Sequence, residues 1–196
     1  GTAVILPLSL EYLEVTNLIN SKITNLSELT KLKYLSLPCC WEELPNDLKN
    51  LNNLKCLKVF DQDTRCLEGN LREGLEELEL INLHSNKIPS TVRKLKVSVY
   101  DRKEPIKQVK ELKISHYTSD DIKEYFPNIE SLKSGEIVHI NSEIKLKKLT
   151  ISQKVNLNYF PGLKELQING GLLFFDIKSI NIPSSKEKII IKCPLF

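Results

Sequence analysis

A short apolar pattern recurs along the whole chain and constrains its fold more than any other feature. A copy consists of an apolar residue, two variable residues, a central leucine or isoleucine, one variable residue and a second apolar residue. Two copies depart from this pattern, because Ser134 replaces the second apolar residue of the seventh copy and Lys186 replaces the first one of the tenth. The central positions of the ten copies are Leu13, Leu35, Leu57, Leu78, Leu95, Leu112, Leu132, Leu149, Leu166 and Ile189. The first three copies are evenly spaced, and several later ones, such as those centred on Leu78, Leu95 and Leu112, lie closer together. Repetition of one motif at such spacings predicts stacked repeat units.

The spacing inside the motif predicts a short strand. Leu35 and Leu37 are two positions apart, so in a strand their side chains point to the same face. A strand this short is unstable alone, but stacking it in parallel on neighbours about 4.8 Å away pairs its backbone and buries its leucines. We therefore expect Leu35, Leu57, Leu78, Leu95 and Leu112 to lie side by side on successive rungs of one ladder.

These copies resemble the leucine-rich-repeat family, whose unit is L-x-x-L-x-L-x-x-N/C-x-L. The best match runs Leu32-Lys-Tyr-Leu35-Ser-Leu37-Pro-Cys-Cys40, with Cys40 at the Asn/Cys position. The resemblance implies an α/β solenoid with a parallel β-sheet on the concave face and mostly extended or short helical return arms. We interpret residues 1–196 as a single domain of about ten coils. Because the chain starts with Gly-Thr and contains no Met, we expect it to be a fragment of a longer protein.

The sequence departs from the family unit in two ways. The shortest spacings, such as that from Leu95 to Leu112, leave little room for a helix, so we expect extended return arms in those coils. The longer coils have room for helical turns at 26–30, 45–51 and 120–126, and the polar loop at 61–70 is expected to be exposed. The Asn/Cys position is mostly lost, being occupied by Leu18, Gln62, Leu83, Tyr100 and Tyr117.

Two proline-bearing segments suggest a subtype. Residues 88–95, beginning Ile88-Pro-Ser-Thr, and residues 182–189, beginning Ile182-Pro-Ser-Ser, resemble the short-armed repeats of the FNIP type. They also resemble the L-P-x-x-L-x-x-L coils of bacterial effector proteins. Both subtypes stay open at this point.

No residue pattern indicates catalysis, a metal or a cofactor. His84, His116 and His139 lie in different coils, and none has a second His or Cys three or four positions away. Gly170-Gly171 is the only glycine pair and lacks the further glycines of a phosphate loop. We therefore expect a protein that is not an enzyme and binds no metal, cofactor or small-molecule substrate.

Cysteine usage and charge bear on the compartment. The five cysteines contain no C-x-x-C pair, which favours reduced thiols in a cytoplasmic protein, with a secreted disulfide-bonded protein as the alternative. The tripeptide Asn25-Leu26-Ser27 is a glycosylation sequon of a kind expected by chance.

No apolar run approaches the roughly 20 residues of a membrane span. The net charge of +3 is too small to demand nucleic acid or an anionic membrane.

The outward residues of the predicted strands form two groups. The first coils carry aromatic side chains, and the middle coils carry a ladder of lysines. The predicted partner-binding residues are Tyr12, Tyr34, Lys58, Phe60, Glu79, Lys94, Lys96, Lys113 and Lys133. Aromatic residues outside a core are enriched at binding hot spots. Two alternatives remain: the aromatic group packs against further N-terminal coils, or the lysines form a solvated face neutralised by Glu77, Glu79 and Glu111.

These features together predict a protein–protein interaction module. Its partner would contact the strand face through an aromatic anchor and a basic rim that accepts an acidic protein. The alternative is the substrate-recognition part of a larger enzyme, such as a ubiquitin ligase or a signalling regulator. Nucleic-acid binding is disfavoured because the aromatic and basic residues are segregated rather than interleaved.

Overall fold

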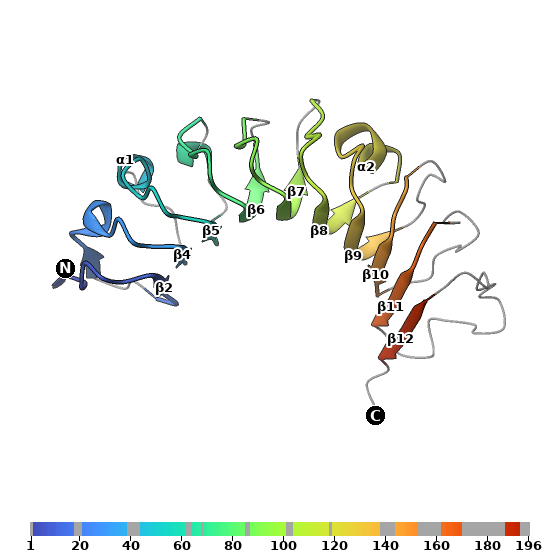
Figure 1. Ribbon diagram of the computed structural model, residues 1–196, viewed down its shortest axis with the longest axis horizontal. Helices are drawn as coiled ribbons and strands as arrows, with labels where there is room; N and C mark the ends of the chain where they lie inside the picture. Colours follow the sequence, from blue (N-terminus) through green and yellow to red (C-terminus); the bar gives the residue numbers. More distant parts are fainter. Residues whose placement is uncertain are drawn as a thin grey trace. The chain divides into compact units, whose positions relative to one another are not determined.

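The repeated pattern forms parallel strands, as shown by a computed structural model of the chain (Figure 1). The structure describes residues 2–17, 21–38, 44–61, 64–67, 69–84, 87–100, 104–117, 119–137, 144–152, 162–169 and 187–192. The chain divides into two compact units, Gly1–Arg102 and Lys103–Phe196.

The first unit contains five parallel strands that follow one another in chain order. They are β2 (Tyr12–Glu14), β4 (Tyr34–Leu37), β5 (Cys56–Val59), β6 (Glu77–Leu83) and β7 (Lys94–Tyr100). Their register places Leu13, Leu35, Leu57, Leu78 and Leu95 side by side on successive strands. A separate pair, β1 (Thr2–Val4) and β3 (Ser21–Ile23), is also parallel.

The second unit repeats this arrangement. Its parallel strands are β8 (Glu111–Tyr117), β9 (Ser131–Ile137), β10 (Lys148–Ile151), β11 (Glu165–Asn169) and β12 (Lys188–Lys192). The corresponding rung is formed by Leu112, Leu132, Leu149, Leu166 and Ile189. Ser134, which interrupts the seventh copy of the motif, still occupies the inward position on β9 and is buried.

The architecture is a parallel-stranded solenoid of about seven turns with little helix, so the predicted parallel ladder is confirmed. Each of the ten motif copies coincides with one strand. The number of turns is therefore smaller than the ten coils that the sequence predicts.

Helical turns occur in the long coils, as predicted. They are η1 (Leu26–Glu28), α1 (Leu44–Leu48) and α2 (Ser119–Tyr125). A further turn, η2 (Arg65–Leu67), lies in the segment 61–70, for which the sequence predicts a loop without helix. Within the described residues, the shortest coils contain no helix between their strands. The expectation of an exposed loop at 61–70 is wrong in part. Leu67 of η2 is buried, and so is Thr64, whose hydroxyl donates a hydrogen bond to the Asn82 carbonyl at 2.6 Å.

The core is built from the inward residues of the strands together with the apolar residues of the return arms, but Ile189 on β12 is 40% exposed. At the Asn/Cys position, Leu83 and Tyr100 are buried apolar or aromatic residues. Leu18, Cys40 and Gln62 lie outside the described residues, and nothing is described of the Tyr117 side chain.

A buried side chain, Asn25, anchors the segment that follows β1 to the segment that follows β3. The side-chain oxygen of Asn25 accepts a hydrogen bond from the Leu6 N–H at 2.9 Å, and its amide donates to the Leu6 carbonyl at 2.9 Å. Asn25 is only 6% exposed, so both bonds are shielded from water. The nitrogen that a glycan would modify is therefore buried and already bonded.

Replacing a leucine of the central rung should destabilise the protein. Leu57 is fully buried, so Leu57→Ala is expected to lower the free energy of unfolding by about 2–5 kcal/mol. Ile5→Ala is the matched control, because Ile5 is 78% exposed and its truncation should cost little. Denaturant unfolding measures both changes, and equal midpoints for the two variants would contradict the assignment of Leu57 to the core.

The folded protein should carry no glycan at Asn25, because a glycan on this amide would prevent its hydrogen bond to Leu6 from forming. The soluble, folded fraction obtained from a glycosylating secretory pathway is therefore expected to show no added glycan mass at this site. Asn25→Ala should lower stability by about 1–3 kcal/mol, because it leaves the backbone of Leu6 unpaired. Ser27→Ala, which removes the sequon but keeps the anchor, should change neither glycan mass nor stability. A glycan detected at Asn25 by intact-mass analysis would contradict the anchor.

Candidate interaction surface

Alternation of side chains along each strand fixes the rows that face outward in the first unit. The register aligns Tyr12, Tyr34, Cys56, Glu77 and Lys94 in one row. It aligns Glu14, Ser36, Lys58, Glu79 and Lys96 in the next row. Phe60 follows the end of β5 and lies beyond the second row. We call these eleven residues the outward face of the first unit, within which Ser36 and Cys56 are buried.

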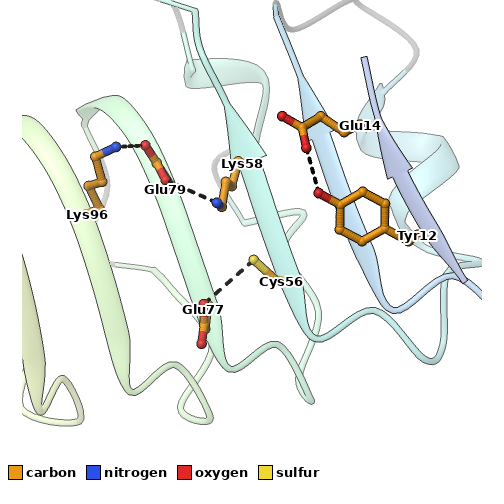
Figure 2. A network of polar contacts seen from close by, with 7 residues as sticks. All are labelled: Tyr12, Glu14, Cys56, Lys58, Glu77, Glu79 and Lys96. Atoms are coloured by element: carbon orange, nitrogen blue, oxygen red, sulfur yellow. Dashed lines mark hydrogen bonds and ion pairs between the residues drawn. The ribbon is translucent and has the colours of Figure 1, made fainter. Parts of the chain in front are cut away.

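Two tyrosines on β2 and β4 form a stacked pair. The ring centroids of Tyr12 and Tyr34 are 4.2 Å apart, and the ring planes differ by 7°. The Tyr12 hydroxyl donates a hydrogen bond to the Glu14 carboxylate at 2.5 Å, as Figure 2 shows. This bond raises the pKa of Tyr12, so the hydroxyl stays protonated. Tyr12 is nevertheless 54% exposed, so the pair presents an apolar surface in a fixed orientation.

One carboxylate on β6 organises two lysines from the neighbouring strands. Figure 2 shows the Glu79 carboxylate between the ammonium groups of Lys58 and Lys96. It forms an ion pair with Lys58 at 3.8 Å and a shorter one with Lys96. The Glu79 side chain is only 12% exposed, whereas those of Lys58 and Lys96 are 30% and 41% exposed. The shielded acid therefore lies beneath two accessible cations.

Each of these two lysines also lies over an aromatic ring. The Lys58 ammonium is 5.1 Å from the centre of the Tyr34 ring, and the Lys96 ammonium is 5.9 Å from the centre of the Phe60 ring. These distances are in the range of a cation–π interaction. Hydrogen bonding with the Tyr34 side chain is the largest cause of the raised pKa of Lys58. Tyr12, Tyr34, Lys58, Glu79, Lys96 and Phe60 thus form one continuous contact chain.

The lysines of the predicted ladder that lie in the first unit pair with glutamates of the neighbouring strand. Lys94 pairs with Glu77 at 2.8 Å, and Lys96 pairs with Glu79. Pairing with neighbouring glutamates, one of the alternatives for the ladder, therefore describes these residues. A basic rim built on Lys94 is not supported, because its charge is matched by Glu77.

The remaining two predicted residues belong to the second unit. Lys113 on β8 and Lys133 on β9 are register partners, and the side chain of Lys133 is exposed. The structure therefore brings together seven of the predicted residues on the outward face of the first unit. Lys113 and Lys133 form a separate pair of neighbours in the second unit.

The prediction missed the roles of Glu14 and Cys56. Glu14 faces outward one position after Leu13, and the period of two could have placed it beside Tyr12 on the same face. The Cys56 thiol donates a hydrogen bond to Glu77 at 3.9 Å (Figure 2). Burial, followed by the charge of Glu77, raises the pKa of Cys56 to about 11.

Ion pairs also form between the residues that directly precede neighbouring strands. Lys33 pairs with Glu11 at 2.7 Å, and Lys55 pairs with Glu76 at 2.9 Å. In the second unit, Glu130 pairs with Lys147 at 2.6 Å and with Lys110 at 3.3 Å. Hydrogen bonds from these lysines lower the pKa of Glu130. The pairs are exposed, so they favour correct register between strands more than they add to stability.

The cysteines differ in state. Cys56 is a free, buried thiol, whereas Cys66 is disulfide-bonded. The expectation of reduced thiols is therefore wrong at Cys66. Cys39, Cys40 and Cys193 lie outside the described residues.

The described residues contain no group of three or more His, Cys, Asp or Glu side chains placed to hold a metal ion. Their helices are all too short or too polar to cross a membrane. The groups gathered on the outward face are aromatic rings, ammonium groups and carboxylates, which suit recognition of another molecule by contact and charge.

The Cys56 thiol should react slowly with alkylating reagents. With a pKa of about 11, about one thiol in a thousand is ionised at pH 8. Glu77→Gln removes a neighbouring negative charge and should shift the pH dependence of iodoacetamide labelling downward. Glu165→Gln in the second unit is the matched control and should leave labelling unchanged. Peptide mass mapping assigns the label to Cys56, and an unaltered labelling profile in Glu77→Gln would contradict the effect of this contact.

Comparison with known proteins gives no family assignment. No protein-family model matches the chain, and no curated protein matches it with significant sequence similarity.

Proposed function

We propose that the chain is a protein-binding module whose outward face in the first unit is the contact surface. The observation that carries the proposal is the continuous contact chain from Tyr12 to Phe60. It combines exposed aromatic surface with charges that are already held in place by their neighbours. Rings and cations fixed before binding lose little conformational freedom on association.

The exposed aromatic area supports recognition of a protein. Tyr12 is 54% exposed and Phe60 is 41% exposed, and large aromatic side chains are the residues that most often dominate binding energy. The alternative that these rings pack against additional N-terminal coils would apply to Tyr12 on β2. Phe60 adjoins β5, which has β4 and β6 on either side. An added coil beyond β2 would therefore not cover the Phe60 ring.

We further propose that the solenoid is of the leucine-rich-repeat type, with no catalytic site and no cofactor of its own. The match of the L-x-x-L-x-L pattern to the strands supports this type, although helix is scarce in the return arms. A role as the substrate-recognition part of a larger enzyme would use the same surface. The two roles differ in whether the bound proteins are chemically modified.

The compartment is also a proposal. The sequence favours the cytoplasm, but the disulfide of Cys66 favours the alternative of an oxidising, secreted location. The buried amide of Asn25 is compatible with either location, because it keeps the sequon inaccessible.

A photoreactive phenylalanine analogue at position 60 tests the proposed contact surface. We expect it to cross-link a partner, and Tyr12→Ala or Tyr34→Ala should weaken that capture by about tenfold, since hot-spot truncations cost about 1–2 kcal/mol or more. Thermal unfolding of these variants should change little, because the rings lie outside the core.

The same analogue at position 5 is the control, because Ile5 is exposed but lies on the β1 side of the unit. Capture of the same proteins from positions 5 and 60, unaffected by Tyr34→Ala, would contradict the proposal. A large loss of stability in Tyr34→Ala would show instead that the ring supports the fold.

A further inference from the structure

We propose that the outward face binds an extended peptide segment that runs across the strands, with an acidic residue over β5–β7 and a basic residue over β2. The inference rests on the proposed function, since it names the chemistry that the same surface accepts. Three features carry it: the position of the cations, the position of an acid, and the distance between them.

The acidic end of the segment is set by Lys58 and Lys96. Their two ammonium groups share the single carboxylate of Glu79, which leaves a net charge of +1 in this group. Each ammonium has three N–H donors, and the one shielded carboxylate cannot satisfy all of them. A second carboxylate, supplied by the partner, would bridge the two cations from the solvent side and balance their charge.

The basic end is set by Glu14 on β2. Its carboxylate accepts the hydrogen bond from Tyr12 and forms no ion pair with another described residue. A lysine or arginine of the partner would complete this site. Between the two ends lie the stacked rings of Tyr12 and Tyr34, and Phe60 flanks Lys96. We therefore expect an aromatic or large apolar side chain next to the acidic residue of the partner.

The strand spacing gives the length of the motif. Glu14 and Glu79 occupy the same outward row on β2 and β6, which are three rungs apart. At about 4.8 Å for each rung, the ends of the site are about 14 Å apart. An extended chain rises about 3.3 Å for each residue, so the acidic and basic residues of the partner should be about four residues apart.

This distribution of charge disfavours a nucleic-acid strand. A strand lying along the row would bring phosphates past Glu14 as well as over the lysines, and like charges repel. A peptide can instead place an acid over the cations and a base over Glu14. Binding of single-stranded RNA in preference to peptides would overturn the proposal.

Selection from a displayed random library of short peptides tests the motif. Wild-type protein should enrich peptides with Asp or Glu beside an aromatic residue and with Lys or Arg about four positions away. Lys58→Gln and Lys96→Gln should each weaken a selected peptide by about threefold to fivefold in Kd, as expected for an accessible ion pair. Lys148→Gln, on β10 of the second unit, is the matched control and should leave the Kd unchanged.

Reversing a charge on the protein and on the peptide together distinguishes a loss of recognition from misfolding of the variant. Lys58→Glu should abolish binding of an acidic peptide and recover binding of the same peptide in which the acid is replaced by lysine. Glu14→Lys should likewise abolish binding of a peptide with a basic residue at that end, and it should recover binding of the same peptide in which that residue is replaced by glutamate. Recovery requires a folded surface, so it cannot come from an unfolded variant.

The outcomes distinguish this inference from the proposed function. If selected peptides show no acidic enrichment, if no peptide is selected, or if charge exchange recovers nothing, the motif is overturned. Should Phe60 cross-linking still depend on Tyr12 and Tyr34 in that case, the binding surface stands with a partner of different chemistry. Loss of both results would overturn the surface as well as the motif.

Discussion

The structure depends on parallel pairing between strands that are too short to persist alone. Even the longest described strands, such as β6 (Glu77–Leu83), span only a few residues. Each becomes stable by pairing its backbone with its neighbours while its leucine enters the shared core. Leu35, Leu57 and Leu78 illustrate this dependence, since each is almost completely buried beside the corresponding residues of adjacent rungs. A shift of one position in any rung would exchange its leucines for outward residues such as Lys58.

The same constraint determines the outward face. Once the leucines are fixed inward, the intervening positions must face outward, and register then brings residues from successive repeats into contact. The Glu79 carboxylate meets Lys58 and Lys96 for this reason alone. Exposed pairs such as Lys33–Glu11 add little stability, but a slipped register would replace these favourable contacts with others. The charges therefore reinforce a register that the leucines set.

Much of the ladder could be predicted from the sequence because its two periods are simple. The period of two inside each motif indicated the inward and outward rows, and the repeat spacing indicated the order of the strands. The shortest spacings correctly indicated coils without helix among the described residues. The burial of Thr64 and the role of Asn25 could not be predicted, because both depend on hydrogen bonds to residues of a neighbouring coil. The pairing of Lys94 with Glu77, in contrast, is one of the two alternatives that the predicted register offers for the lysines.

The arrangement of lysines over rings gives the proposed contact surface an advantage over a simple basic patch. An exposed lysine is flexible, and ordering it on binding costs about 1–2 kcal/mol of side-chain entropy. Lys58 and Lys96 are already held between Glu79 and an aromatic ring, so most of that cost is met in folding. Because Glu79 cancels only half of their charge, the group stays attractive to an acid while its geometry is fixed. The affinity for a partner would then come from lysines that the strand register already holds in place. The specificity would come from the distance between these lysines and Glu14.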